Sequence, residues 1–161
     1  LFYSQHIKNG RVNHEESGND YNWITDSKQS LIQPNENYVF CKRFTAKEEK
    51  RRLQCGVYLF KDFPDYKYIG TQNKINYVNR LDDSPLESSE AFGLYALLNT
   101  TLFDQYYRIL NGSTQVNSSE INSMPFPPSD IIKSIGQKLM DNGDLSTEAC
   151  NKIVNEIAYY E

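Results

Sequence analysis

The segment YRILNGSTQVNSSEINSMPFPP, residues 107–128, contains the bend around which the predicted fold is arranged. Asn111 and Gly112 are typical of a helix end, and the run SSE at residues 118–120 is typical of a helix start. Between them lie the residues STQVN, of which we expect only Val116 to pack inward. The sequence therefore predicts a polar bend between two helices.

The polar side chains of this bend have a binding use and a structural use. Held near helix ends, such side chains can hydrogen-bond an anion, the edge of a nucleotide base or the protein's own main chain. Serine, threonine and asparagine often satisfy neighbouring backbone groups, so a purely structural bend is the simpler alternative. The residues of the bend alone leave both uses open.

Short strands are predicted before residue 80, where β-branched and aromatic residues dominate runs between turn-forming residues. The clearest runs are residues 38–44, 54–60, 66–70 and 74–78, with shorter extended pieces at residues 1–7 and around 21–24. Their aromatic side chains are expected in the sheet core rather than as stacking platforms for bases: Tyr38, Phe40, Phe44, Tyr58 and Tyr77. Thr45 and Glu48 also fit a capping box for one helical turn, but a β–loop–β unit is preferred for residues 38–60.

Helices are predicted after residue 88, where apolar residues recur at helical spacing. The first begins at Ser89 and Glu90, the second carries residues 102–110 with Thr101 and Asp104 as caps, and two more span residues 130–141 and 147–160. Ser129 and Ser146 are natural N-caps, and Gly143 is a natural helix stop. Strands followed by helices indicate the α+β class, with a mixed or antiparallel sheet in the N-terminal half.

The length of 161 residues fits one domain with a helical appendage, and we expect a domain at residues 1–128 with a helical extension at 129–161 packed on it. Because the first residue is Leu, we expect the sequence to be a piece of a longer protein. No apolar run approaches the roughly 20 residues that span a bilayer, so no membrane partner is expected. Three cysteines without a C-x-x-C pattern favour a reduced, cytoplasmic setting without a zinc site.

The net charge of −4 conceals a division along the chain. Residues 1–80 hold 13 Lys and Arg against 9 Asp and Glu, whereas residues 81–161 hold 4 against 12. Six cations lie close together in sequence beside Glu48 and Glu49: Lys42, Arg43, Lys47, Lys50, Arg51 and Arg52. A local positive field can steer an anionic partner whatever the total charge, although a solvated charged loop is the plain alternative.

Catalytic motifs are absent from the sequence. It contains no glycine-rich nucleotide loop and no G-x-S-x-G elbow, and neither His6 nor His14 lies beside a nucleophile. We assign catalysis to no residue, and we expect a binding function.

The run FDQYYRILNGSTQVNSSEINSMPFP, residues 103–127, resembles the end of the target-recognition domain in adenine-specific DNA methyltransferases of type II restriction–modification systems, the TaqI-like and Eco57I-like groups. Those proteins carry a segment of the form N-G-[HS]-T-Q-V-N-[AS]-x-[ED]-[IL] before a proline-bounded exit. SQHIKNGRV (4–12), YVFCKRFTAKEEKRRL (38–53) and QNKINYV (72–78) resemble further segments in the same order. Ser113 stands where His is frequent, and Gln72 and Lys74 replace Glu and His, which bears on the DNA sequence recognised.

The resemblance implies a specificity-domain fold and a double-stranded DNA partner. In that family a separate, upstream catalytic domain binds S-adenosylmethionine and carries an N-P-P-Y loop, which receives an adenine flipped out of the duplex. The present sequence has no N-P-P-Y, so no cofactor is expected within it, and the methyl-transfer chemistry is expected upstream. Some members of the family also carry a fused nuclease.

Four groups of residues are the candidate DNA contacts. The basic run is expected to contact phosphates, with one arginine available for a guanine edge, and Gln115 is the preferred reader in the bend. The groups are Lys42, Arg43, Lys47, Lys50, Arg51 and Arg52; Gln72, Asn73, Lys74 and Asn76; Ser113, Thr114, Gln115 and Asn117; and Gln5, His6, Lys8 and Arg11. The acidic residues 81–161 are expected to face away from DNA. Two alternatives are a recognition domain of a type I restriction specificity subunit and a protein-interaction module that does not bind DNA.

Overall fold

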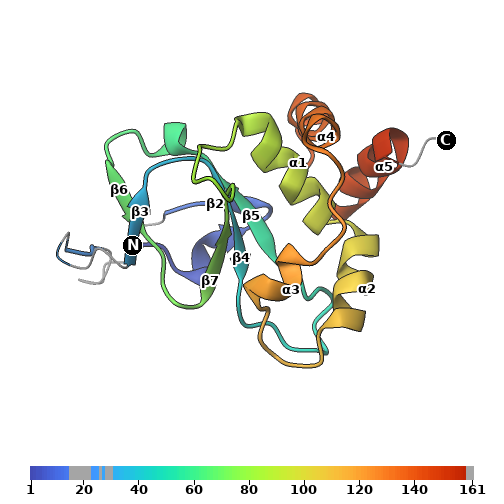
Figure 1. Cartoon of the computed structure of the whole chain (residues 1–161), viewed down its shortest axis with the longest axis horizontal. Helices are drawn as coiled ribbons and strands as arrows, with labels where there is room; N and C mark the ends of the chain where they lie inside the picture. The colour runs from blue at the N-terminus through green and yellow to red at the C-terminus, as the bar shows by residue number, and fades with distance from the viewer. Residues whose placement is uncertain (15–22, 26, 28–30, 159–161) are drawn as a thin grey trace.

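The computed structural model describes residues 1–14, 23–25, 27 and 31–158 and places a β-sheet region beside a group of helices (Figure 1). Within these ranges the strands all precede residue 79, and the α-helices all follow residue 87. This order confirms the predicted α+β class, with a sheet in the N-terminal half followed by helices.

The main sheet has the strand order β1–β2–β5–β4–β7 and is mixed, since β2 and β5 run parallel while the other neighbours run antiparallel. Its strands are β1 (Ile7–Lys8), β2 (Arg11–Val12), β4 (Tyr38–Lys42), β5 (Cys55–Tyr58) and β7 (Ile75–Val78), and a second sheet pairs β3 (Ile32–Pro34) with β6 (Tyr68–Gly70). The four clearest predicted strands are thus confirmed, each one to three residues shorter than expected.

The two weaker strand predictions fared differently. Within residues 1–7, the segment Ser4–His6 forms a 3-10 helix, η1, so an extended conformation was wrong there. Of the piece around residues 21–24, residues 21 and 22 lie outside the described ranges.

Each face of the main sheet has its own core because side chains alternate along β4. Val39 and Cys41 lie in the core shared with the helices, whereas Phe40 packs in an aromatic cluster, with its ring centroid 5.9 Å from that of Phe2. The prediction of buried aromatics is confirmed for Tyr38, Phe40 and Tyr58 but wrong for Phe44 and Tyr77, which are 47% and 43% exposed. Phe44 lies beyond the end of β4, and Tyr77 lies on the edge strand β7, so neither is fully covered.

The α-helices of the described chain are α1 (Ser88–Leu98), α2 (Thr101–Leu110), α3 (Ser118–Asn122), α4 (Ser129–Asn142) and α5 (Thr147–Ala158), with a further 3-10 helix η3 at Phe60–Asp62. Their described ends lie within one residue of the predicted ones, and residues 159–160 of the last predicted helix lie outside the described ranges. None of these helices is long and apolar enough to cross a membrane.

Of the predicted helix caps, Thr101 and Ser129 are wrong, and Ser146 and Gly143 are confirmed. Thr100, not Thr101, caps α2 by accepting the Phe103 N–H at 3.2 Å, and Ser129 is the first residue of α4 and donates to Glu90 instead of capping. Ser146 accepts the Ala149 N–H at 3.2 Å, and Gly143 ends α4 with a left-handed φ of 77°.

Helices α1 and α4 pack with their backbones unusually close, because a glycine lies on each side of the contact. A Cβ atom added to Gly93 would lie 1.9 Å from the carbonyl oxygen of Ile132, and one added to Gly136 would lie 1.7 Å from that of Ser89. The helices after residue 128 thereby join the main core, where Leu139 belongs to the same cluster as residues of β4. The division into a domain and an extension at residue 128 stays a prediction.

Gly136→Ala should lower the free energy of unfolding by about 1–3 kcal/mol, because backbone atoms of α1 block the new methyl group. Alanine has the better helix propensity by about 1 kcal/mol, so the sign of the change tests whether the close contact dominates. The urea midpoint measures this change. Gly112→Ala is the control, since no atom lies within 4 Å of its added Cβ, and it should leave the midpoint nearly unchanged. Equal midpoints for both variants would contradict the α1–α4 contact.

Candidate nucleic-acid interface

The predicted polar bend lies against the chain that leaves β4. Val116 donates its N–H to the carbonyl of Arg43 at 2.7 Å, and Phe44 pairs with Gln115 in an isolated antiparallel bridge. Val116 itself is fully buried, as predicted, and this anchors the bend in the core. Two segments separated by about 70 residues of sequence are therefore joined through their main chains.

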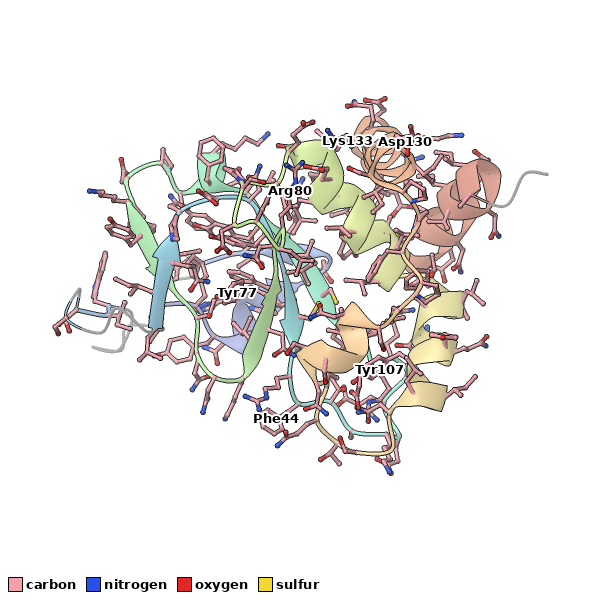
Figure 2. The ribbon with its side chains drawn as sticks, in the orientation of Figure 1. Phe44, Tyr77, Arg80, Tyr107, Asp130 and Lys133 are labelled. Carbon is pink, nitrogen blue, oxygen red and sulfur yellow. The ribbon has the colours of Figure 1, made fainter. Side chains whose placement is uncertain are left out.

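The loop before β7 joins the same end of the sheet. Arg43 donates its N–H to the carbonyl of Lys74 at 2.9 Å, and the Asn76 amide donates to the carbonyl of Val116 at 2.6 Å. Members of three of the four predicted groups thus meet in one place together with Phe44. We call this place the loop face, and it consists of Arg43, Phe44, Asn73, Lys74, Ser113, Thr114 and Gln115. Figure 2 shows Phe44 at this end of the molecule, beyond the tip of the sheet.

Arg108 of α2 holds the basic loop between β4 and β5 in place. Its guanidinium donates to the carbonyls of Lys47 and Glu49 at 2.8 Å each and pairs with Asp104 at 3.0 Å. The side chains of Lys47 and Lys50 stay exposed, so the backbone of the loop is fixed while its cations face solvent. Arg108 was not among the predicted functional residues, although its i,i+4 spacing from Asp104 was a usable signal.

Glu49 stabilises the same loop from within. It accepts the Ala46 N–H at 2.7 Å and a hydrogen bond from the Gln54 amide at 2.5 Å, and these bonds lower the pKa of Glu49. The Glu49 carboxylate thus joins the start of the basic loop to Gln54, just before β5.

Arg52 is a structural residue, and its predicted contact with DNA is wrong. The residue is 1% exposed, and its guanidinium donates to the Thr45 hydroxyl at 3.1 Å and to the Ser113 carbonyl at 2.8 Å. It also lies 3.4 Å from the Asn111 side-chain oxygen and 6.0 Å from the ring centre of Tyr107. A side chain buried in this way joins the basic loop to the bend and cannot reach a phosphate.

Arg51 and Lys42 are also turned away from the loop face. Arg51 donates to the carbonyls of Leu98 and Thr100 at 3.0 and 3.2 Å, where it satisfies the last turn of α1. Lys42 is half-buried and lines a cleft together with Arg51. The Arg51 guanidinium is therefore used at the end of α1 and is not proposed as a phosphate contact.

Asp104 does not cap α2 as predicted but binds the basic loop. One oxygen of its carboxylate accepts the N–H groups of both Arg52 and Leu53 at 2.8 Å, and the other pairs with Arg108. Asp104 is buried, so these bonds replace its lost contact with water.

Several polar residues of the bend serve the fold itself. The Ser113 hydroxyl donates to the Gln115 carbonyl at 3.0 Å, and Asn117 forms a capping box with Glu120 at the start of α3. The Asn76 amide, from β7, donates to the carbonyl of Val116 in the bend. The main chain of Gln72 binds Phe2 and Ile75 at the start of the β6–β7 turn. These bonds support the structural use of the polar side chains of the bend for Ser113 and Asn117.

Gln115 and Thr114 differ from their neighbours. Their side chains make no hydrogen bond to any other residue within the described ranges, and Thr114 is exposed while Gln115 is half-exposed. The bridge to Phe44 and the bond from Asn111 to the Gln115 carbonyl fix the backbone of this segment, so both side chains project from a fixed position. They are the residues of the bend best able to bind a partner.

Glu120 closes the bend on its inner side. Burial alone would raise its pKa, but hydrogen bonds from the Tyr107 hydroxyl at 2.7 Å, the Asn111 amide and the Asn117 N–H outweigh burial and lower the pKa of Glu120. Burial, together with the bond to Glu120, raises the pKa of Tyr107, so its hydroxyl remains a donor. The carboxylate thus ties α2, the bend and α3 together.

The fourth predicted group lies elsewhere. His6 is 3% exposed and packs edge-on to Phe2 with ring centres 6.0 Å apart, so its predicted contact with DNA is wrong. Arg11 stacks on Phe92 at 4.7 Å, and its strand β2 is separated from β7 by β5 and β4. Gln5 and Lys8 are exposed, and Lys8 lies on β1, the edge strand opposite β7.

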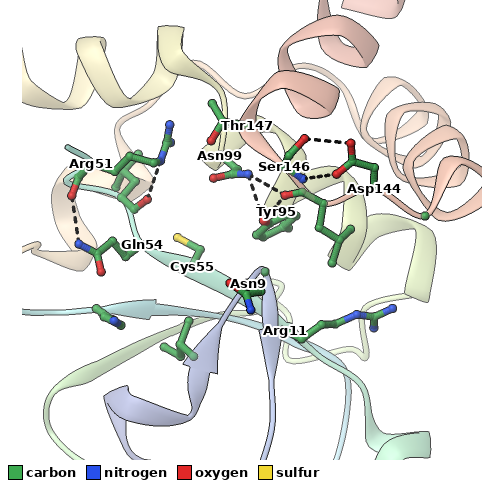
Figure 3. Close-up of a pocket in the computed structure, with 16 residues that line it drawn as sticks. Asn9, Arg11, Arg51, Gln54, Cys55, Tyr95, Asn99, Asp144, Ser146 and Thr147 are labelled. Atoms are coloured by element: carbon green, nitrogen blue, oxygen red, sulfur yellow. Dashed lines mark hydrogen bonds between the residues drawn. The ribbon is translucent and has the colours of Figure 1, made fainter.

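A cleft of about 710 Å³ lies between the β1–β2 hairpin, the start of β5 and the α4–α5 connection (Figure 3). Some of its polar groups bind one another: Tyr95 donates its hydroxyl to the Leu145 carbonyl at 2.8 Å, and Asp144 accepts from Ser146. The loop face is therefore the stronger candidate site.

Known proteins that resemble the chain share one class. No protein-family model and no solved structure matches it significantly, but two curated proteins do, and both are type II methyltransferases.

The first is type II methyltransferase M.PstI of Providencia stuartii, 35% identical over 133 residues, which are 83% of this chain and 26% of that protein. The second is type II methyltransferase M.BsuBI of Bacillus subtilis, 37% identical over 144 residues, which are 88% of this chain and 28% of that protein. The chain thus spans about a quarter of the length of the curated relatives that it matches.

Arg52→Ala should lower the free energy of unfolding by about 3 kcal/mol, because it removes buried hydrogen bonds and leaves the Ser113 carbonyl unpaired. Chemical denaturation followed by circular dichroism measures this change. Lys50→Ala, an exposed cation two residues away, is the matched control and should have little effect on stability. Similar stabilities for the two variants would show that the Arg52 guanidinium is not part of the core.

Glu120→Gln should reduce the loss of stability in acid. Because the pKa of Glu120 is lower in the folded protein, its ionised form adds stability above the unfolded-state pKa of about 4.3. That contribution is lost as the pH falls through the folded-state pKa. Free energies of unfolding at pH values between 7 and 3 should therefore fall less steeply for the variant, and Tyr107→Phe should give a smaller change in the same direction. Parallel curves for Glu120→Gln and the original protein would refute the predicted linkage.

Proposed function

We propose that this chain is the part of a type II DNA methyltransferase that recognises double-stranded DNA, with the methyl-transfer chemistry in another part of the protein. The main support is the meeting of three separate loops in one face that carries cations and amide groups. The similarity to two type II methyltransferases supports the restriction–modification setting. The resemblance noted in the sequence favours adenine N6 as the methylated atom.

In this proposal the cations of the loop face and the basic loop position the duplex. Arg43, Lys47, Lys50 and Lys74 contact phosphates, since their side chains are exposed or half-exposed. The rigid attachment of the basic loop by Arg108 holds two of these cations at a fixed distance from the bend. A fixed spacing lets phosphate contacts set the register of the duplex.

Base reading is assigned to the bend. Gln115 carries an amide that can bind an adenine edge in bidentate fashion, and Thr114 can bind a base or a sugar. Phe44, paired with Gln115 and 5.9 Å from the Arg43 guanidinium, offers an exposed ring to a base step or a sugar.

Cofactor binding is assigned to the part of the protein outside this chain. The sequence has no N-P-P-Y loop, and in the cleft beside β5 the Tyr95 hydroxyl and the Asp144 carboxylate are already hydrogen-bonded to neighbouring residues. We propose that S-adenosylmethionine and the flipped adenine bind elsewhere, while this chain selects the site.

Binding of the 161-residue chain to duplex DNA should weaken steeply with salt. Four phosphate contacts predict a slope of log K against log salt of roughly −3.6. The double variant Arg43→Ala, Lys74→Ala should reduce that slope by about 2 on every duplex. Lys152→Ala, an exposed cation of α5, is the control and should keep the original slope. A slope near zero for the unmodified chain would favour the protein-interaction alternative.

Gln115→Ala should change the preference among DNA sequences rather than the general affinity. Loss of a bidentate amide contact removes about 1–3 kcal/mol of discrimination at one base pair. A binding selection from a randomised duplex library measures the preference. Gln137→Ala, an exposed glutamine of α4, should leave the selected sequences unchanged. If Gln115→Ala weakens all duplexes equally, the residue does not read bases.

A further inference from the structure

Helix α2 has an apolar face that no part of the described chain covers. Leu102, Tyr106, Ile109 and Leu110 are 51%, 40%, 81% and 39% exposed, and their spacing of four, seven and eight residues puts them on one side of the helix. Phe103 and Tyr107, on the adjacent side of α2, are already buried in the core. Figure 1 places α2 at the margin of the molecule. The apolar face of α2 is therefore wider than the part that the core covers, and its exposed part calls for a partner.

Charge is absent from this outer face. The charged residues of α2 are Asp104 and Arg108, and both bind the basic loop between β4 and β5. The exposed residues of the helix are Thr101, Leu102, Gln105, Tyr106, Ile109 and Leu110, none of which carries a charge. Depletion of charge with an aromatic residue among aliphatic ones is the composition of an interface centre.

We propose that the outer face of α2 docks onto the remaining part of the methyltransferase polypeptide, an inference that rests on the proposed function. The aligned segments are only 26% and 28% of the two relatives, so most of each relative has no counterpart here. A neighbouring domain of the same polypeptide is therefore the partner that the comparison makes available.

The size of the face favours a tethered domain over a second copy of the chain. A helix of 10 residues is about 15 Å long, which is short for a stable dimer that must bury roughly 1,200 Å² or more. Domains joined in one polypeptide need less contact, because the linker keeps their effective concentration high. Interfaces between domains of one chain are accordingly small, about 600–1,500 Å².

The position of the face gives it a function in catalysis. One side of α2 supports the loop face through Asp104 and Arg108, and the other side bears the docking residues. A domain seated there is held at a fixed distance from the bound duplex, so recognition and methyl transfer act on the same site.

Ile109→Asp in the complete methyltransferase polypeptide should reduce methyl transfer to duplex DNA at least tenfold, because it places a charge in the docked interface. Leu81→Asp is the matched control, since Leu81 is fully exposed and lies outside α2, and it should keep the original rate. In the 161-residue chain, Ile109→Asp should leave both DNA affinity and the thermal transition unchanged. An unchanged methylation rate would overturn the proposal.

Oxidative footprinting provides a readout that does not depend on activity. Tyr106 and Leu102 should be at least several-fold less reactive toward hydroxyl radicals in the complete polypeptide than in the 161-residue chain. Equal reactivity would overturn the proposal, as would a dimer of the 161-residue chain that Ile109→Asp disperses, because a second copy would then be the occupant. If the 161-residue chain fails to bind DNA while the footprint and the rate effect appear, only the proposed recognition function fails.

Discussion

The buried contact between the basic loop and α2 is the interaction on which the candidate site depends. The Asp104 carboxylate accepts the N–H groups of Arg52 and Leu53, while the Arg52 guanidinium, 1% exposed, crosses to the Ser113 carbonyl. Burying a charged group is costly unless its donors are satisfied, so this arrangement permits little variation in geometry. The loop after β4 and the bend after α2 are therefore held together from beneath.

Two of the six cations of the basic run bind within the protein and are not available at its surface. Arg51 and Arg52 are used inside the molecule, where they bind main-chain carbonyls. The cations left at the surface are carried by a backbone that Arg108 fixes in place. Preorganised loops lose less entropy on binding, which suits a face that must hold a duplex in one register. Helix α2 supports this face and also presents the apolar outer residues, so it links the two surfaces of the molecule.

Sequence patterns predicted the fold well and the site in part. The strands before residue 79 and the helices after residue 87 follow from local periodicity, whereas the bonds that join Arg43 to Lys74 and Val116 connect segments that are distant in sequence. Burial of Arg52 and His6 could not be predicted, because a cation's environment depends on residues such as Asn111 and Phe2 that are distant in sequence. Exposure of Phe44 escaped prediction for a related reason, since its hydrophobicity matched β4 while the strand ended two residues earlier.

Amide hydrogen exchange of the 161-residue chain, with and without a duplex at low salt, measures whether the three loops bind DNA together. We expect slower exchange in three separate segments, residues 43–50, 72–76 and 113–117, while α4 and α5 exchange as before. Slower exchange confined to the β1–β2 hairpin or to the helices after residue 128, with the three loops unchanged, would contradict the claim that these loops form one surface for DNA.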